Sequence, residues 1–135
     1  MTASNSYVYF ALKGDNFNPD DVTDGLGILP SQIRRQGQSI GNSGKTIKFS
    51  AWYLYTDKID NLFVNKLVEN VVERLFDKID TINGLKKEFD LTSILEIVLY
   101  IDKNDEVSTP VIGHDLRTIE FLFRTNTETD VDIYL

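Results

Sequence analysis

The chain alternates between short apolar or aromatic runs and longer segments with helical spacing. Four runs hold the β-branched and aromatic residues that favour strands, and their apolar positions recur at every second residue. They are Tyr7–Lys13, Thr46–Thr56, Leu91–Asp102 and Asp130–Leu135. The pattern therefore predicts four strands, with a further short extended piece over Val107–Ile112.

Three segments between the strands are predicted to be helical. Asn18–Pro19 is a good start for a helix, and Gly25–Gly27 can end it. Asp57–Phe89 has apolar residues at helical spacing and predicts one long helix, which Gly84 breaks or bends in its second half. A third helix is expected over about His114–Arg124.

These elements follow one another in the order β-α-β-α-β-α-β, which gives two βαβ-like halves around the long helix. The order predicts an α+β fold. We expect a mainly antiparallel sheet of four or five strands, ferredoxin-like in general character, with the helices packed on one face. At 135 residues, the chain has the size of one domain, residues 1–135, that can bury its own core.

The amino-acid composition of the chain argues against several classes of partner and site. Fourteen Lys and Arg against twenty-one Asp and Glu give a net charge of −7, which disfavours nucleic acid and anionic membranes as partners. No apolar run approaches the roughly 18 residues that a membrane span needs. Because the chain has no cysteine, disulfides and cysteine metal sites are excluded. The polar start has no signal-peptide pattern, so we expect a cytoplasmic protein.

Two motifs resemble ligand-binding loops but lack required residues. Gly44-Lys45-Thr46 matches the end of a P-loop, but Ser39 stands where the first glycine is needed and a strand follows instead of a helix. Asp102–Glu106 alternates acids as a calcium loop does, without the loop's glycine or final glutamate. We therefore interpret both segments as turns.

Catalytic constellations are also missing. His114 is the single histidine, and no Gly-x-Ser-x-Gly nucleophile motif accompanies it, so we interpret it as an exposed or capping residue. Asp15, Asp20, Asp21 and Asp24 cluster where the N-terminus of a helix attracts acids. We expect no catalytic residue, no metal site, no cofactor and no enzyme activity.

The most unusual local feature is a basic, glycine-rich loop on an acidic chain. Ser31–Lys48 contains four basic residues and no acid. Such a loop can bind an anion or an acidic partner surface, or it can simply balance the acidic body. Trp52, on the strand that follows, is either an interface anchor or a core residue. The candidate ligand-binding or partner-binding residues are Arg34, Arg35, Lys45, Lys48 and Trp52.

Several motifs together resemble a known family. The most specific is Gly14-Asp15-x-Phe17-x-Pro19-Asp20-x-Val22-Thr23-x-x-Leu26-Gly27-Ile28-x-Pro30. It is accompanied by Arg34-Arg35-x-Gly37, Trp52-x-Leu54 and the C-terminal Asp130-Val131-Asp132-Ile133-Tyr134. Over about residues 7–135 the chain resembles the family called domain of unknown function 4279. The resemblance implies a small bacterial protein of a kind associated with toxin–immunity loci, and it supplies no catalytic residues.

Taken together, these features favour a non-catalytic protein-binding module, in the form of an immunity-type inhibitor of a basic, toxin-like partner. Two alternatives remain. One is a binder of a small anionic ligand through Arg34 and Arg35, whose guanidinium groups suit charge-assisted hydrogen bonds. The other is a structural homo-oligomer, such as a homodimer that pairs through Asp130–Leu135 as an exposed edge strand.

Overall fold

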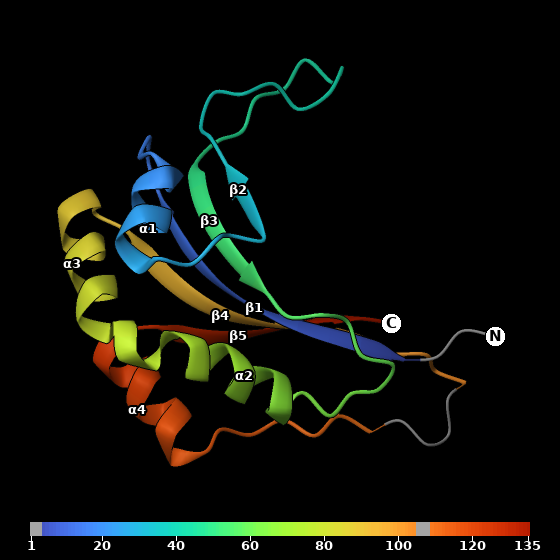
Figure 1. The fold of residues 1–135 in the computed structure, drawn as a ribbon. Coiled ribbons are helices and arrows are strands. Elements are labelled where there is room, and N and C mark those ends of the chain that lie inside the picture. The colour runs from blue at the N-terminus through green and yellow to red at the C-terminus, as the bar shows by residue number, and fades with distance from the viewer. Residues whose placement is uncertain (1–3, 105–108) are drawn as a thin grey trace.

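The computed structural model describes residues 4–104 and 109–135. Five strands form one sheet in the order β2-β3-β1-β4-β5, and the helices pack on one face of it (Figure 1). The strands are β1 (Asn5–Gly14), β2 (Gln32–Arg34), β3 (Ser50–Tyr55), β4 (Thr92–Tyr100) and β5 (Glu128–Tyr134). The helical elements are α1 (Pro19–Leu26), α2 (Asn65–Leu75), the 3₁₀ turn η1 (Phe76–Lys78), α3 (Ile79–Phe89) and α4 (Leu116–Thr125).

The sheet is mixed. β1 pairs antiparallel with β3 and β4, and β2 pairs antiparallel with β3, whereas β5 runs parallel to β4. The α+β class and the helices on one face are confirmed, and the strand number lies within the predicted four or five, but the strand added to the four predicted ones is β2. In the predicted order, the first βαβ-like half joined the first strand to the Trp52 strand through the first helix. In the structure these two strands, β1 and β3, are antiparallel neighbours. The strand that runs parallel to β1 is β2, with β3 between them.

β2 lies inside the segment that the sequence predicted as a loop, so the predicted element order is wrong at that point. β2 has only three residues and no alternation of its own, and it is extended because β3 pairs with it. β3 itself begins at Ser50 instead of the predicted Thr46. Residues 35–49 project from the sheet as an irregular loop (Figure 1).

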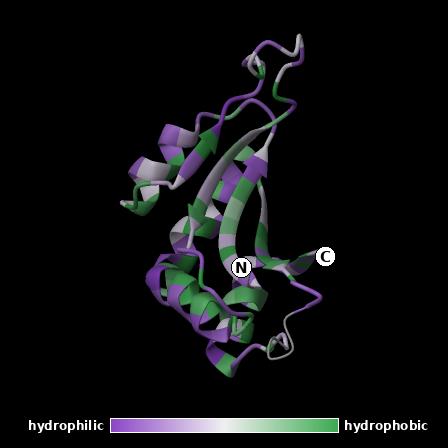
Figure 2. Cartoon of the chain, turned by 90° about the vertical axis from the view of Figure 1, so that its right-hand side faces the viewer, coloured by the Kyte–Doolittle hydropathy of each residue, from purple (hydrophilic) through white to green (hydrophobic). Residues whose placement is uncertain are grey.

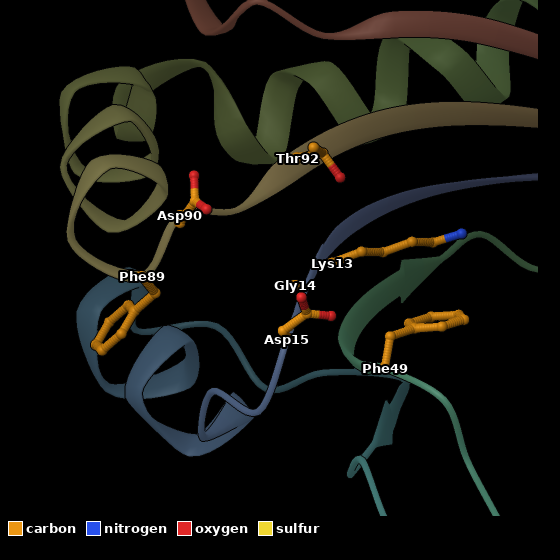
Figure 3. Close-up of a pocket in the computed structure, with 7 residues that line it drawn as sticks. All are labelled: Lys13, Gly14, Asp15, Phe49, Phe89, Asp90 and Thr92. Atoms are coloured by element: carbon orange, nitrogen blue, oxygen red, sulfur yellow. The ribbon is translucent and has the colours of Figure 1, made fainter.

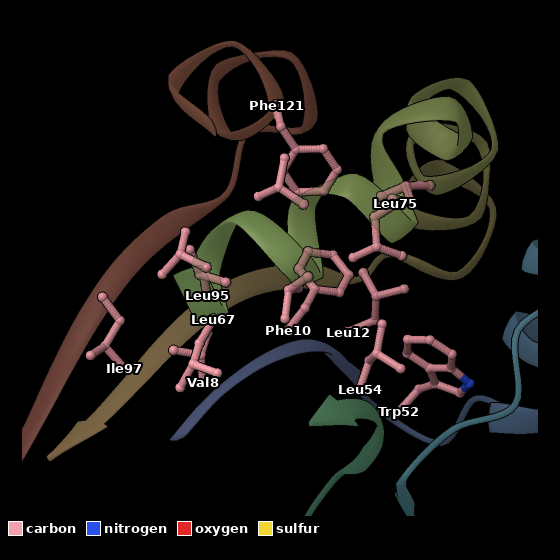
Figure 4. Close-up of a cluster of buried hydrophobic side chains, with 14 of the residues drawn as sticks. Val8, Phe10, Leu12, Trp52, Leu54, Leu67, Leu75, Leu95, Ile97 and Phe121 are labelled. Atoms are coloured by element: carbon pink, nitrogen blue, oxygen red, sulfur yellow. The ribbon is translucent and has the colours of Figure 1, made fainter. Parts of the chain in front are cut away.

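The core lies between the sheet and the helices. Alternate side chains of the three central strands point to the helices and are fully buried, as Figure 4 shows for Phe10, Trp52 and Leu95. Burial of each such side chain contributes about 1.5–3 kcal/mol. The helices carry hydrophobic and hydrophilic residues side by side along their length (Figure 2), as amphipathic helices do.

The predicted start and end of α1 are confirmed. Asn18 caps the helix, since its side-chain oxygen accepts a hydrogen bond of 3.0 Å from the Asp20 amide. Gly27 ends it at φ +68°, and its amide donates to the Thr23 carbonyl at 2.8 Å. Gly27 has the left-handed conformation that glycine tolerates best.

The long helical region is broken, but not at Gly84. Helix begins only at Asn65, and the break is the 3₁₀ turn η1, after which α3 continues through Gly84. The helix-propensity cost of one glycine is about 1 kcal/mol, which is too small to end a helix that is packed elsewhere. The third helix begins at Leu116, with Asp115 as its N-cap, instead of at His114.

Two expectations fall partly outside the described residues. These are the short extended piece over Val107–Ile112 and the turn over Asp102–Glu106, since residues 105–108 are not described. Within the described part of the first segment, Val111 forms an isolated bridge with Phe63. No helix in the described ranges is long and apolar enough to cross a membrane.

Candidate functional site: the uncovered face of the sheet

The face of the sheet opposite the helices carries all six tyrosines of the chain. Strand register places Tyr9 beside Tyr55 and Glu96, and Tyr7 and Tyr53 on the same side. No helix of the described residues packs on this side. We call this surface the tyrosine face. Its members are Tyr7, Tyr9, Ala11, Ala51, Tyr53, Tyr55, Ile94, Glu96, Val98, Tyr100, Asp130, Asp132 and Tyr134.

The tyrosine rings pack against one another. The Tyr9 ring centroid lies 5.0 Å from that of Tyr55 in a stacked pair and 5.5 Å from that of Tyr53 in an edge-on pair. Tyr100 and Tyr134 stack at 4.8 Å at the other end of the face. Each such pair contributes about 0.5–1.5 kcal/mol beyond the area it buries. The rings therefore form an aromatic surface in which neighbouring rings are in contact.

Burial raises the pKa of the phenols of Tyr7, Tyr9, Tyr53 and Tyr55. These hydroxyls are neutral at physiological pH, and a neutral phenol can both donate and accept a hydrogen bond. The Tyr55 hydroxyl already donates to the side-chain oxygen of Gln32 at 2.9 Å. The surface thus combines apolar ring faces with polar tips.

Two lysines lie over rings of this face. The Lys58 ammonium is 5.7 Å from the ring centroid of Tyr7 and 5.5 Å from that of Tyr100. The Lys13 ammonium lies 5.4 Å from the ring of Phe49 and 6.0 Å from that of Tyr53. Cation–π contacts of this kind contribute about 0.5–1 kcal/mol at exposed sites. They show that the rings attract cations.

A carboxyl pair lies beside the rings. Glu96 is in register with Tyr9 on β1 and with Asp130 on β5, and it is only 7% exposed. Burial raises its pKa to about 7, and the hydrogen bond and the charge of Asp130 add to the shift. Asp132 raises the pKa further, whereas Lys13 opposes the shift. In the described part of the chain, no three His, Asp or Glu side chains converge as metal ligands.

The candidates from the sequence do not come together. Arg35 is held by α1, since its guanidinium donates to both Asp20 carboxylate oxygens at 3.1 Å and to Asn18 at 2.9 Å. Arg34 lies on β2 opposite Ala51, at the margin of the tyrosine face. Lys45 and Lys48 are exposed on the projecting loop.

Trp52 lies on the other side of the sheet. Its side chain is fully buried beneath α1, and its indole N–H donates to the Thr23 hydroxyl at 3.0 Å. The alternative that the sequence left open, a core tryptophan, is what the structure shows. Of the five candidates, Arg34 is therefore the one that borders the tyrosine face.

The other polar residues singled out in the sequence have local roles. Asp20 and Asp21 lie in the first turn of α1, where the helix dipole favours acids. The His114 ring nitrogen Nε2 lies 2.9 Å from the Thr129 hydroxyl, and this contact ties the segment before α4 to β5. Among the described residues no side chain hydrogen-bonds the other ring nitrogen, Nδ1, so the His114–Thr129 pair lacks the orienting acid of a catalytic triad.

A shallow pocket lies at the end of the sheet where β1 stops and β4 begins. Its volume is about 350 Å³, and Figure 3 shows the Lys13 and Phe49 side chains on one side of it and Asp90 on the other. The remaining lining residues are Gly14, Asp15, Phe89 and Thr92. The pocket is open and mixes one lysine with two carboxylates, so its charges select no single class of ligand.

Sequence reasoning missed the tyrosine face, although a signal for it was present. Tyr7 and Tyr9, and again Tyr53 and Tyr55, are spaced by two, which puts each pair on one face of its strand. Both strands also have an apolar opposite face. A strand with apolar residues on one face and tyrosines on the other indicates a sheet with one covered and one aromatic, solvent-facing side.

Comparison with known proteins gives one match. The sequence model of the family described as "Domain of unknown function (DUF4279)" matches residues 4–135, nearly the whole chain. No curated protein and no solved structure matches it. The match covers every strand and helix described above, and on that ground the chain belongs to the DUF4279 family.

Proposed function

We propose that the protein is a non-catalytic protein-binding module that docks its partner on the tyrosine face. The observation that carries the proposal is the gathering of all six tyrosines on the side of the sheet that no described helix covers. Tyrosine is enriched at protein interfaces and among their energetic hot spots. Its ring gives a large contact area with few rotatable bonds to immobilise.

The packing within the face supports this proposal. A solvated sheet face ordinarily carries polar residues at alternate positions. Here the central positions other than Glu96 are aromatic or aliphatic, and the rings pack against one another without a partner. Preorganisation of this kind lowers the entropy cost of binding. Stability of the sheet alone does not require tyrosine at every one of these positions.

Charge supports a basic partner. The chain carries −7 overall, and Glu96, Asp130 and Asp132 lie on the β4–β5 half of the face. Acidic inhibitors of basic proteins associate rapidly because the opposite fields steer their encounter. We propose an immunity-type inhibitor as the form of this function. Cytoplasmic location is part of the same proposal, since a chain without cysteine needs no oxidising compartment.

The alternative of a small anionic ligand held by Arg34 and Arg35 has less support. An anion at Arg35 would have to displace Asp20, which already holds that guanidinium with two hydrogen bonds. Arg34 and Arg35 are consecutive in sequence, but only Arg34 lies at the margin of the open face. A thermal-shift screen with phosphates, nucleotides and carboxylates tests this alternative, and Arg34→Ala should abolish any shift that it detects.

We also propose that the fold is ferredoxin-like. The first four strands lie in the order β2-β3-β1-β4 and are joined by α1 and by the α2–α3 region, a connectivity that supports a ferredoxin-like arrangement with α4 and β5 added. A fold of this kind hosts many functions, so it adds no weight to any one of them.

Site-specific photo-crosslinking in the native cell tests the docking surface. A benzophenone amino acid replaces Tyr55, on the tyrosine face, or Lys66, a side chain of α2 that is 86% exposed. The same partner should be captured from the Tyr55 position and not from the Lys66 position. Capture from both positions alike, or from neither, would contradict the proposed docking surface.

A further inference from the structure

β5 is the last strand of the sheet, and among the described residues only β4 pairs with it. In a parallel ladder, alternate residues of a strand direct their backbone groups to one neighbour and the residues between them direct theirs to the other side. The Tyr134 carbonyl accepts from the Ile101 amide at 2.8 Å, so the even-numbered residues of β5 face β4. The backbone N–H and C=O groups of Thr129, Val131 and Ile133 therefore face the free edge.

The side chains of β5 alternate in chemistry. Val131 and Ile133 lie on the helix side, in register with the buried Ile97 and Leu99, yet they are 37% and 54% exposed. The helix layer does not cover this part of the strand. The opposite side carries only carboxylates before Tyr134, namely Glu128, Asp130 and Asp132. The free edge is thus apolar on one side and acidic on the other.

We propose that the β5 edge binds an extended segment of a partner protein in which basic and apolar residues alternate, so that the segment becomes a sixth strand of the sheet. The inference rests on the proposed protein-binding function and names the chemistry of the partner. Backbone hydrogen bonds to an exposed edge provide affinity, and alternate side chains provide specificity. Lys or Arg side chains of the segment would lie opposite Asp130 and Asp132, and its apolar side chains would cover Val131 and Ile133.

A second copy of the chain fits this edge poorly. In an antiparallel pair, residues opposite each other point to the same side of the sheet. A two-fold pairing of β5 with itself would therefore set Glu128, Asp130 and Asp132 against the same three acids of the other copy. Like charges directly opposite are destabilising, and charged edge strands are a common protection against self-association. The same charges attract a basic strand.

Amide exchange in the presence of designed peptides tests the proposal. The probe is a capped hexapeptide of sequence Lys-Val-Lys-Ile-Lys-Val, added to the full chain at up to millimolar concentration. Two control peptides are used. One contains the same residues with the three lysines placed together, and the other has glutamate in place of each lysine. The alternating basic peptide should slow exchange at Val131 and Ile133 by roughly tenfold or more, as newly hydrogen-bonded amides do, and neither control should.

Two variants separate edge pairing from simple charge attraction. Val131→Pro removes one edge-facing N–H without removing a bond to β4, a position where proline is tolerated, and should abolish the effect. Val131→Thr keeps the N–H and the β-branched side chain, and should retain it. The double variant Asp130→Asn/Asp132→Asn, which leaves Glu128 as the one acid on this side of β5, should weaken binding about fivefold at low salt and reduce its salt dependence.

Three results would overturn the proposal. The first is no slowing at Val131 and Ile133 with the basic peptide. The second is equal slowing with the control that has its lysines placed together. The third is slow exchange at these amides without peptide, accompanied by a dimeric mass in light scattering, because the edge would then pair with a second copy. If a partner is captured from the Tyr55 position but the peptide has no effect on exchange, the tyrosine-face proposal stands and the β5-edge proposal is rejected.

Discussion

Glu96→Gln is expected to make the protein more stable at pH 8 and to leave its stability nearly unchanged near pH 4.5. Glu96 is 7% exposed, and one of its carboxylate oxygens has no hydrogen-bond partner among the described residues. Burial, followed by the neighbouring Asp130 and Asp132, raises its pKa from 4.5 to about 7. The folded protein therefore holds a proton here under conditions in which the unfolded chain has released it.

The direction of the pH dependence follows from proton linkage. Between about pH 4.5 and pH 7 the folded state binds more protons at this position than the unfolded state does, so the free energy of unfolding falls as the pH rises. The stability that the protonated group provides is complete below pH 4.5 and is lost as the pH rises through about 7. The full shift corresponds to about 3 kcal/mol, and solvent access to the open face reduces this to roughly 2 kcal/mol.

The substitution removes the titrating group and keeps its shape. The amide that replaces the carboxyl can donate to Asp130 at every pH, so no buried charge appears at pH 8. The expected gain of about 2 kcal/mol corresponds to a Tm increase of roughly 7 °C for a domain of this size. Urea unfolding of both proteins at pH 4.5, 6, 7 and 8 measures the difference directly.

A control variant isolates the effect. Glu88→Gln makes the same chemical change at an exposed position of α3 and should alter stability by less than about 0.5 kcal/mol at every pH. If the difference between wild type and Glu96→Gln does not grow between pH 4.5 and pH 8, the raised pKa is refuted. The same holds if Glu88→Gln gives an equal difference.

Three further changes test the fold itself. Thr23→Val removes the acceptor of the buried Trp52 N–H, and should cost about 1–2 kcal/mol in urea unfolding followed by the fluorescence of this one tryptophan; a cost below about 0.5 kcal/mol would contradict the bond. Gly84→Ala, in open space on α3, should stabilise the protein by about 0.5–1 kcal/mol. Gly27→Ala, at φ +68°, should destabilise it by about 1 kcal/mol. Thermal unfolding that ranks the two variants in the opposite order would refute the helical conformation of Gly84 and the left-handed conformation of Gly27. Lys86→Met leaves two backbone carbonyls at the end of α4 and one β4 hydroxyl without their ammonium donor, and should cost about 2 kcal/mol by calorimetry; unchanged stability would show that water replaces the ammonium.

Features set by neighbouring residues were predictable from the sequence. The start and end of α1 depend on Asn18, Pro19 and Gly27, and each acts within one turn of the helix. The central strands were found because their apolar positions alternate. The three residues of β2 were missed because pairing with β3, and no local pattern, makes them extended. The parallel pairing of β5 with β4 likewise depends on contacts between distant segments.

For the candidate site too, the sequence predicted what neighbouring residues determine and missed what the strand order determines. The sequence drew attention to charges that stand out against an acidic background, and the structure shows that Arg35 is neutralised by Asp20 and that Trp52 is core. The tyrosines attracted no attention because each lies among the apolar residues of its strand or, as Tyr134 does, beside acids, and no single strand shows them as a group. They form a surface only when β3, β1, β4 and β5 lie side by side, and the order of strands cannot be read from any one strand.

The tyrosine face and the β5 edge share Asp130, so their chemistry is linked. Asp130 raises the pKa of Glu96, and a basic side chain placed beside this pair would favour its charged form. Ligand binding that releases a proton must strengthen as the pH rises through the pKa concerned. The affinity of the alternating basic peptide should therefore increase from pH 5 to pH 8, and Glu96→Gln should flatten that increase. An affinity that stays constant over this pH range would show that peptide binding at the β5 edge is not coupled to the protonation of Glu96, since lysine remains charged throughout.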